Sequence, residues 1–335
     1  MDKRLPQEPR RGCVVACADG NWAWQSAFVL MRSVGFDRDG VLDHHLYLAG
    51  PVDQRVLDIL PPEITLHRIA ELPEAYAAGA NGHVPAATML RFTALEELGR
   101  RYERVIYLDG DVFQAWGSLA DLLAVDMGRA PLAGVLDRSQ WSRGRVQWFQ
   151  DYLDALAARR GVECLHYFNA GVLMIHGPAY VAADLSAEAV SFIGTNPDVC
   201  RRGDQSALNA VMAGRWCEIS PGWNWQMSHV VSGLTASRRP RLIHFTDRLK
   251  PWEDTLRLLP PEAFDAMFHF LQTHGLTDLL SDKAPCHFDY RIQERLRARK
   301  MDEWAGNAFA KREAVKAYLD RKDFADHAAG LRSFG

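Results

Sequence analysis

The chain has no long hydrophobic run, no Cys-x-x-Cys pair and no excess of positive charge. No segment approaches the roughly 20 apolar residues that a membrane-spanning helix needs. The six cysteines are scattered and lie mostly within apolar segments, which is typical of buried free thiols in a reducing compartment. The apolar stretch Gly12–Ala18 is too short for the core of a signal peptide. These absences favour a cytoplasmic protein.

The charge balance indicates which kind of partner to expect. The chain has 39 Lys and Arg against 42 Asp and Glu, a formal net charge of -3, and the two signs are mixed throughout. A dedicated nucleic-acid-binding protein usually carries a basic excess or a basic stripe. We therefore expect no nucleic-acid partner and a small-molecule substrate instead.

The first part of the chain alternates between short apolar segments and amphipathic ones. Strands are expected at Cys13–Ala18, His44–Leu48 and Ile64–Ile69, with helices at Trp22–Ser33 and Val52–Leu60 between them. Such βαβ alternation predicts a parallel sheet covered by helices. At 335 residues the chain can hold one large α/β domain with an appendage, or two modest domains.

The segment Arg104–Phe113 joins a predicted buried strand to two acids. Val105–Leu108 is an apolar run of β-branched and aromatic residues, and Asp109 and Asp111 follow it. If the chain stays extended, both carboxylates leave on the same side and can share one cation. A cation would offset the cost of burying two unpaired charges. The alternative is an ordinary polar turn, because Asp-Gly-Asp is also common turn chemistry.

Two further polar residues lie where a ligand of an α/β sheet would be met. Asp19 follows the first strand, so it either caps the next helix together with Asn21 or contacts a nucleotide. Arg91 lies among apolar residues of a helix predicted at Ala86–Leu98. Its guanidinium either snorkels to solvent or reaches an anionic ligand or the two acids.

Downstream segments add more candidate ligand groups. The small residues of Asn169–Gly171 suit either a close approach to a ligand or a turn before an apolar strand. Asp204 begins a predicted helix, either as its N-cap or as a ligand contact. His244 ends a predicted strand, either as a neutral metal ligand or as a structural histidine. Lys250 supplies a point charge suited to a phosphate.

The order and spacing of these motifs resemble glycosyltransferase family 8, which includes lipopolysaccharide galactosyl- and glucosyltransferases and the glycogenins. The matching motifs are Leu90–Phe92, Tyr107–Val112, Phe168–Val172, Asp204–Asn209, Pro221–Trp225 and His244–Trp252. The opening Ala18–Trp22 also resembles the nucleotide-contacting start of that family. The resemblance covers the chain from about Cys13 to Trp252.

This resemblance implies a GT-A fold over residues 12–275, an α/β architecture with a mostly parallel central sheet flanked by helices. The implied activity is metal-dependent transfer of a hexose, glucose or galactose, from a UDP-sugar with retention at the anomeric carbon. The implied acceptor is a saccharide or a glycolipid, as in polysaccharide or lipopolysaccharide biosynthesis.

The resemblance also implies three groups of site residues. The ligands of Mn²⁺ or Mg²⁺ would be Asp109, Asp111 and His244. The donor-binding residues would be Asp19 and Asn21 at the uridine, Lys250 at the diphosphate, and Arg91, Asn169 and Asp204 at the sugar. The catalytic residues would be Gln205, beneath the reacting carbon, with Asp204 and Arg91. Carboxylates, an imidazole and phosphate oxygens suit Mn²⁺ or Mg²⁺ better than a tetrahedral zinc ion.

The residue proposed beneath the reacting carbon indicates how retention is achieved. Gln205 carries an amide, which is a poorer nucleophile than a carboxylate. We therefore expect front-face attack, in which the leaving phosphate accepts the proton of the acceptor hydroxyl. A double displacement through Asp204 is the alternative.

Asp247 departs from the family pattern, which usually has glycine at this position. A carboxylate ~5 Å from a phosphate would cost roughly 3 kcal/mol at an effective dielectric constant of about 20. We expect Asp247 to point to solvent or to pair with Arg248 instead.

The tail of the chain, residues 276–335, has a different composition. Tyr290–Lys300 and Asn307–Asp320 are predicted as charged helices with few apolar anchors. We expect a C-terminal helical appendage packed on the domain. An alternative is weak peripheral contact with an anionic bilayer at the inner face of a membrane, which the interleaved acids would weaken.

Two other functional classes remain as alternatives. A sugar-nucleotide pyrophosphorylase would need a glycine-rich basic loop after the first strand, and Ala18–Asn21 has no basic residue. A sugar-nucleotide-binding protein without transfer activity would share the site but not the turnover. Hydrolysis of a UDP-sugar in the presence of Mn²⁺ separates an enzyme from such a binding protein.

Overall fold

The computed structural model describes residues 10–70, 89–142, 147–160, 166–227, 235–246, 250–254, 259–281, 308–321 and 330–334. Asp247, Arg248 and the segment Tyr290–Lys300 lie outside the described residues, so the expectations about them stay predictions. Within the described ranges, every helix falls short of the length and apolar character that a membrane crossing requires.

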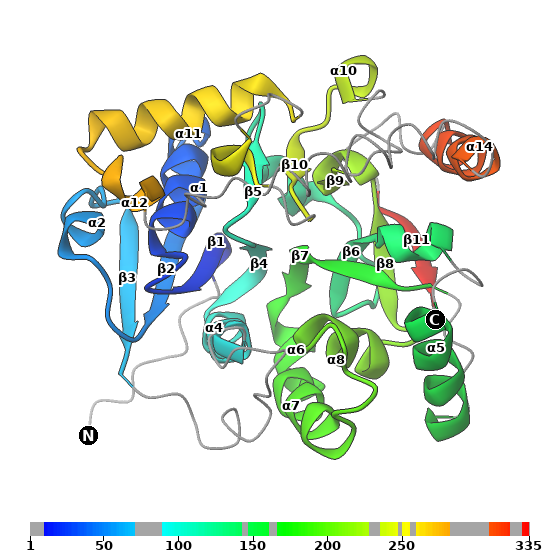
Figure 1. The fold of residues 1–335 in the computed structure, drawn as a ribbon. Coiled ribbons are helices and arrows are strands. Elements are labelled where there is room, and N and C mark those ends of the chain that lie inside the picture. The colour runs from blue at the N-terminus through cyan, green and yellow to red at the C-terminus, as the bar shows by residue number, and fades with distance from the viewer. Residues whose placement is uncertain are drawn as a thin grey trace, which may run out of the picture.

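An eight-stranded sheet forms the centre of the molecule (Figure 1). Its strand order is β11-β8-β6-β7-β4-β1-β2-β3. These strands are β1 (Arg10–Asp19), β2 (Asp43–Ala49), β3 (Ile64–Ile69), β4 (Tyr102–Leu108), β6 (Leu132–Leu136), β7 (Phe168–His176), β8 (Trp216–Ile219) and β11 (Gly330–Phe334).

Strand directions confirm the prediction of a mostly parallel central sheet. Strands β4, β1, β2 and β3 run parallel to one another, and β6 runs parallel to β8. Strand β7 is antiparallel to both of its neighbours, β4 and β6, and the edge strand β11 is antiparallel to β8. The segment Asn169–Gly171 lies inside β7, so the alternative of a turn before the strand is wrong.

Helices cover both faces of the sheet because its central strands are apolar on both sides. In β4, Val105 and Tyr107 enter one hydrophobic core, whereas Ile106 and Leu108 enter another. Alternate side chains of a strand face opposite sides, so these two cores lie on opposite faces. The core of Ile106 contains α1 (Ala23–Phe36) and α11 (Pro261–Thr273), and that of Val105 contains α4 (Leu90–Gly99), α7 (Leu185–Thr195) and α8 (Asp204–Val211).

The remaining helical segments are shorter or lie at the periphery (Figure 1). The α-helices are α2 (Gln54–Asp58), α5 (Gln147–Arg160), α6 (Gly177–Ala182), α10 (Thr235–Arg238), α12 (Asp278–Ser281) and α14 (Ala308–Leu319). The 3-10 turns are η2 (Leu119–Ala124), η3 (Arg138–Ser142), η4 (Pro221–Trp223) and η5 (Pro251–Glu253).

A small second sheet stands beyond the end of β4. It consists, in order, of β5 (Val112–Gln114), β10 (Leu242–His244) and β9 (Trp225–Gln226). Strand β10 is antiparallel to β5, and in this register His244 lies opposite Val112. The N–H of Phe245 also donates to the carbonyl of Asp111 at 3.1 Å. The small sheet therefore carries His244 to the two acids that follow β4.

The described part of the tail packs on the central sheet. Helix α14 begins at Ala308, close to the predicted start, and its Tyr318 hydroxyl donates to the Glu218 carboxylate at 2.7 Å. Arg321 pairs with the same carboxylate at 3.1 Å, and Glu218 is fully buried in β8. Beyond this helix the chain forms β11, so the tail contains an edge strand as well as the predicted helix.

Candidate active site

A cleft of about 300 Å³ lies where the neighbouring strands β1 and β4 end. Ligands of open α/β sheets are commonly bound outside the carboxyl ends of the strands. The cleft is lined by Cys17, Ala18, Asp19, Trp22, Ser26, Arg91, Tyr107, Asp109, Gly110, Asp111 and Asp204. This lining includes five of the predicted site residues, which come from β1, α4, the turn after β4 and α8.

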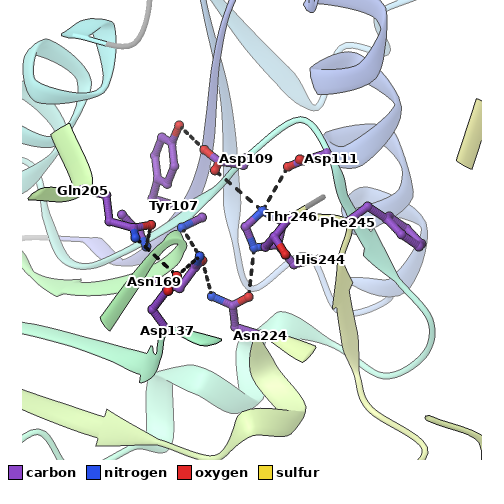
Figure 2. A network of polar contacts seen from close by, with 12 residues as sticks. Tyr107, Asp109, Asp111, Asp137, Asn169, Gln205, Asn224, His244, Phe245 and Thr246 are labelled. Atoms are coloured by element: carbon purple, nitrogen blue, oxygen red, sulfur yellow. Dashed lines mark hydrogen bonds and ion pairs between the residues drawn. The ribbon is translucent and has the colours of Figure 1, made fainter. Parts of the chain in front are cut away.

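Asp109 and Asp111 stand on a turn between β4 and β5, so the expectation of a continuing strand is wrong. The N–H of Val112 donates to the Asp109 carbonyl at 3.2 Å and closes this turn. The turn nevertheless aims both carboxylates at His244, whose Nε2 lies 3.1 Å from Asp111 Oδ1 and 3.9 Å from Asp109 Oδ2 (Figure 2). The structure thus brings together the three residues predicted as metal ligands.

Lys250 places a positive charge next to Asp111. Its Nζ lies 2.6 Å from Asp111 Oδ2 and donates to the Phe245 carbonyl at 2.6 Å. Burial alone would raise the pKa of the Asp111 carboxyl, but the Lys250 ammonium and the His244 imidazole hold that pKa well below its usual value. Asp111 is therefore an anionic group at neutral pH, as a metal ligand must be.

Arg91 reaches the acids rather than solvent. Its buried guanidinium pairs with Asp109 Oδ1 at 2.9 Å and with Asp204 Oδ2 at 2.7 Å. It also donates to the Ala170 carbonyl at 3.0 Å, and its Cζ lies 4.3 Å from the centre of the Tyr107 ring. The Tyr107 hydroxyl donates to the same Asp109 oxygen at 2.9 Å. These contacts fix Asp109 Oδ1, which leaves Oδ2 directed toward His244.

Asp204 lines the cleft and is not the N-cap of α8. The N-cap of α8 is Gly203, and no side chain caps this end of the helix. Burial raises the pKa of Asp204 to about 6, with a further contribution from Asp109, while Arg91 opposes the shift. The ion pair to Arg91 therefore opposes the effect of burial and favours the ionised form of Asp204.

Gly171 leaves the space that His244 occupies. A Cβ atom at this position would lie 2.0 Å from His244 Cε1 and 2.8 Å from Asp109 Oδ2. Neither distance is compatible with van der Waals contact. The glycine of the Phe168–Val172 motif is therefore required by the packing of Asp109 and His244 against β7.

The other predicted residues of the sugar end belong to a network of buried polar contacts (Figure 2). Asn169 donates to Asp137 Oδ2 at 2.9 Å and accepts from Asn224 at 2.9 Å. Gln205 accepts from the Ala170 N–H at 3.0 Å and donates weakly to Asp137 Oδ2 at 3.3 Å. In the described part of the chain, neither Asn169 nor Gln205 is among the residues that line the cleft.

Of the two predicted uridine-binding residues, only Asp19 is among the residues that line the cleft. Asp19 lines the cleft at the end of β1 and accepts a hydrogen bond from the N–H of Asn21 at 2.9 Å. Asn21 itself is exposed. The exposed Trp22, which was not predicted as a site residue, lines the cleft beside them, and its ring contacts Trp252 edge to face at 5.6 Å.

Besides Trp22, sequence reasoning missed Tyr107, Asn224 and Asp137, which contact predicted site residues. Tyr107 lay within the predicted strand and Asn224 within a quoted motif, but neither was assigned a role. Asp137, an acid at the end of β6, resembles Asp19 in its position and could have been found by the same argument.

Comparison with solved structures places this architecture in a known class. An active-site mutant of LgtC matches with a TM-score of 0.60 and 24% identity, over 77% of this chain and 95% of that chain. The galactosyltransferase LgtC in complex with donor and acceptor sugar analogs matches with a TM-score of 0.57. The fold is therefore that of the GT-A glycosyltransferases, with a mostly parallel central sheet flanked by helices.

Sequence comparison identifies the family. Residues 77–256 match the model of glycosyl transferase family 8, so the chain belongs to this family. General stress protein A of Bacillus subtilis is 25% identical over 183 residues, covering 50% of this chain and 58% of that protein. Lipopolysaccharide 1,3-galactosyltransferase of Salmonella typhimurium is 26% identical over 176 residues, covering 50% of this chain and 49% of that protein. The chain thus spans about half the length of the relatives it matches.

Proposed function

We propose that this protein transfers a hexose from a UDP-sugar to a saccharide or glycolipid acceptor, with retention at the anomeric carbon and with a divalent cation. The observation that carries the proposal is the convergence of Asp109, Asp111 and His244, because both acids line a cleft that Asp19 also lines. Membership of glycosyl transferase family 8 supports the same reaction class.

The residues present fit a divalent cation. One ligand atom from each of the three side chains lies within 4.8 Å of the others, and the set comprises two carboxylates and an imidazole. Such a set suits Mn²⁺ or Mg²⁺, with positions left for diphosphate oxygens. When bound, the cation would act as a Lewis acid on the departing diphosphate. Lys250 would then be available to contact a diphosphate oxygen, since the cation would share the charge of Asp111.

The remaining side chains would orient the donor. Arg91 holds Asp109 and Asp204 in fixed positions and lines the cleft, as expected of a residue at the donor sugar. Asp19, which lines the cleft, and Asn21 would contact the uridine. Asn169 and Gln205 would act at the sugar end, where the buried contacts of both amides to Asp137 and Ala170 restrict their movement.

The hexose is proposed to be glucose or galactose. Support comes from relatives named lipopolysaccharide 1,3-galactosyltransferase and, in Escherichia coli, lipopolysaccharide 1,2-glucosyltransferase. A cytoplasmic location, with weak contact of the tail at a membrane surface, is part of the proposal. The free thiols of Cys13, Cys200 and Cys217 are buried in the structure, which agrees with a reducing compartment.

The test is the cation-dependent turnover of an Asp111→Asn variant. Replacing the carboxylate with an amide keeps the shape but removes an anionic ligand, so we expect turnover of UDP-glucose or UDP-galactose with Mn²⁺ to fall by roughly 100-fold or more. Asp58→Asn, at the exposed end of α2, is the matched control and should retain turnover. A panel of UDP- and GDP-sugars with Mn²⁺ identifies the donor.

Two results would contradict the proposal. Equal turnover in Asp111→Asn and wild type would remove Asp111 from the metal site. Tight binding of a UDP-sugar by the wild type, without hydrolysis or transfer for any donor of the panel, would indicate a binding protein instead of an enzyme.

A further inference from the structure

His244 can serve as a metal ligand only if the nitrogen that faces the acids carries a lone pair. Its Nε2 faces Asp111 and Asp109, and its Nδ1 lies 3.0 Å from Asn224 Oδ1. A neutral imidazole has one N–H and one lone pair, so the partner of Nδ1 decides which nitrogen is free. The orientation of the Asn224 carboxamide therefore decides whether Nδ1 of His244 carries the proton.

The far end of the network fixes the orientation of Asn169. The Asp137 carboxylate accepts hydrogen bonds from the Ser139 backbone N–H at 2.7 Å, from Asn169 Nδ2 at 2.9 Å and from Gln205 Nε2 at 3.3 Å. A carboxylate only accepts hydrogen bonds, so Asn169 must turn its NH₂ group to Asp137. The backbone N–H of Gly171 donates to Asn169 Oδ1 at 3.0 Å and requires the same orientation independently.

The orientation of Asn169 in turn fixes Asn224. Asn224 Nδ2 donates to Asn169 Oδ1 at 2.9 Å, so Asn224 Oδ1 points to His244. A carboxamide oxygen only accepts hydrogen bonds, which means that Nδ1 of His244 must carry the proton. The hydrogen bonds therefore run in one direction, from His244 through Asn224 and Asn169 to Asp137 (Figure 2).

We propose that Asn224 is a positioning residue that holds His244 in the Nδ1–H tautomer, with the lone pair of Nε2 directed at the site between Asp109 and Asp111. Asn169 and Asp137 hold Asn224 in the orientation that this requires. The inference rests on the proposed function in that His244 is taken as a metal ligand.

Burial of the hydrogen-bonded residues opposes any reversal of the two carboxamides. Asp137, Asn169, Asn224 and His244 are each no more than 5% exposed. In such surroundings a reversed carboxamide would face oxygen to oxygen, or N–H to N–H, with no water to replace the lost partner. The residues come from four different places in the chain, after β6, on β7, before β9 and on β10. The tertiary fold thus sets both the tautomer and the orientation of the His244 imidazole.

Two substitutions of Asn224 separate the acceptor oxygen from the rest of the side chain. Asn224→Asp keeps an acceptor opposite Nδ1, so Nδ1 should keep its proton, although the second carboxylate oxygen would face Asn169 Oδ1 and should lower stability. Asn224→Leu has a similar volume but no acceptor, so the Nε2–H form should become populated. The control is Asn209→Leu, which removes another buried carboxamide, one that bonds the backbone of Phe168 and Gln205. It should lower stability without changing the His244 ring.

The measurement is long-range ¹H–¹⁵N correlation NMR of histidine-labelled, metal-free full-length protein at pH 8.5, with a His244→Gln variant to assign the signal. We expect a protonated Nδ1 in wild type, Asn224→Asp and Asn209→Leu, whatever the state of Nε2 beside the two carboxylates of the metal-free site, and a fraction with unprotonated Nδ1 in Asn224→Leu. Calorimetric titration with Mn²⁺ should show affinity reduced by about 10- to 100-fold in Asn224→Leu, which is typical for loss of a partner that orients a ligand. Asn224→Asp should lose less.

The proposal is overturned if wild-type Nδ1 lacks a proton, or if Asn224→Leu keeps both a protonated Nδ1 and the wild-type Mn²⁺ affinity. Failure of the proposed function has a different signature. In that case Mn²⁺ does not bind the wild type at all, while the tautomer of His244 still responds to Asn224→Leu, and the positioning role of Asn224 stands.

Discussion

Replacing Gly171 with alanine should displace His244 and weaken metal binding while leaving the fold intact. The added methyl group would lie 2.0 Å from His244 Cε1, whereas carbon atoms in contact stay about 3.5 Å or more apart. The imidazole must therefore move by roughly 1.5 Å. Metal–ligand distances vary by only about 0.2 Å, so this shift removes His244 from the coordination shell.

The expected magnitudes follow from the same geometry. Mn²⁺ affinity should fall by at least the 10- to 100-fold typical of a disturbed ligand partner, because here a ligand itself is displaced. The free energy of unfolding should fall by about 1–3 kcal/mol, the usual cost of overpacking. Gly171 is not among the glycines with positive φ, so its backbone accepts alanine without strain and the effect belongs to the methyl group alone.

Gly134→Ala is the matched control, on the neighbouring strand β6. A Cβ atom there would lie 3.5 Å from Leu173 Cδ2 and 3.5 Å from Phe168 Cβ, which is ordinary contact. This variant should bind Mn²⁺ like the wild type and change the free energy of unfolding by less than about 1 kcal/mol. Calorimetric titration with Mn²⁺ and urea denaturation measure both quantities. Wild-type Mn²⁺ affinity in Gly171→Ala, beside a wild type that binds the ion, would refute the reasoning.

The stereochemistry of transfer and the pH dependence of stability provide two further tests. The product should keep the anomeric configuration of the donor by NMR. Because Arg91 holds the carboxylate of Asp204, mass spectrometry should find no glycosylated Asp204; a trapped adduct would establish double displacement. Burial, with His67 and Arg101, lowers the pKa of His45 from about 6.5 to about 4, so the unfolded state binds the extra proton first as the pH falls. The difference in free energy of unfolding between wild type and His45→Gln, measured by urea denaturation, should become less favourable to wild type by about 2 kcal/mol between pH 8 and pH 5. An unchanged difference would show that His45 does not titrate in this way.

The central strands could be predicted from the sequence because each is a continuous apolar run. Val105–Leu108, for example, is apolar on both faces. A central strand of a layered α/β sheet packs against other elements on both faces, so it suits this segment. Strand β11 could not be predicted, because Gly-Leu-Arg-Ser-Phe has no strong pattern and its state is decided by pairing with β8. The antiparallel direction of β7 could not be predicted either, since the composition of an apolar strand does not depend on whether it pairs parallel or antiparallel.

The identities of the candidate metal ligands could be predicted, but their geometry could not. The order of motifs pointed to Asp109, Asp111 and His244, and the structure brings them together. The convergence does not come from strand alternation, which the two-residue spacing of the acids had suggested. It comes from a turn closed between Asp109 and Val112 and from a second sheet that presents His244 from the other side. Two different backbone arrangements can place two acids on one cation, and spacing alone does not distinguish them.

The buried carboxamides show where sequence reasoning ends for physical reasons. An asparagine has two donors and an acceptor, and nothing in its neighbours along the chain indicates which of them will be used. For Asn224, the choice is made by Asn169 on β7, whose own orientation is set by Asp137 after β6 and by the N–H of Gly171. Gly171 therefore acts twice, by leaving room for the His244 ring and by fixing the carboxamide that leads to it. A substitution at Gly171 acts on the position of the ring, whereas one at Asn224 acts on its proton, so the two variants should lower metal affinity for separable reasons.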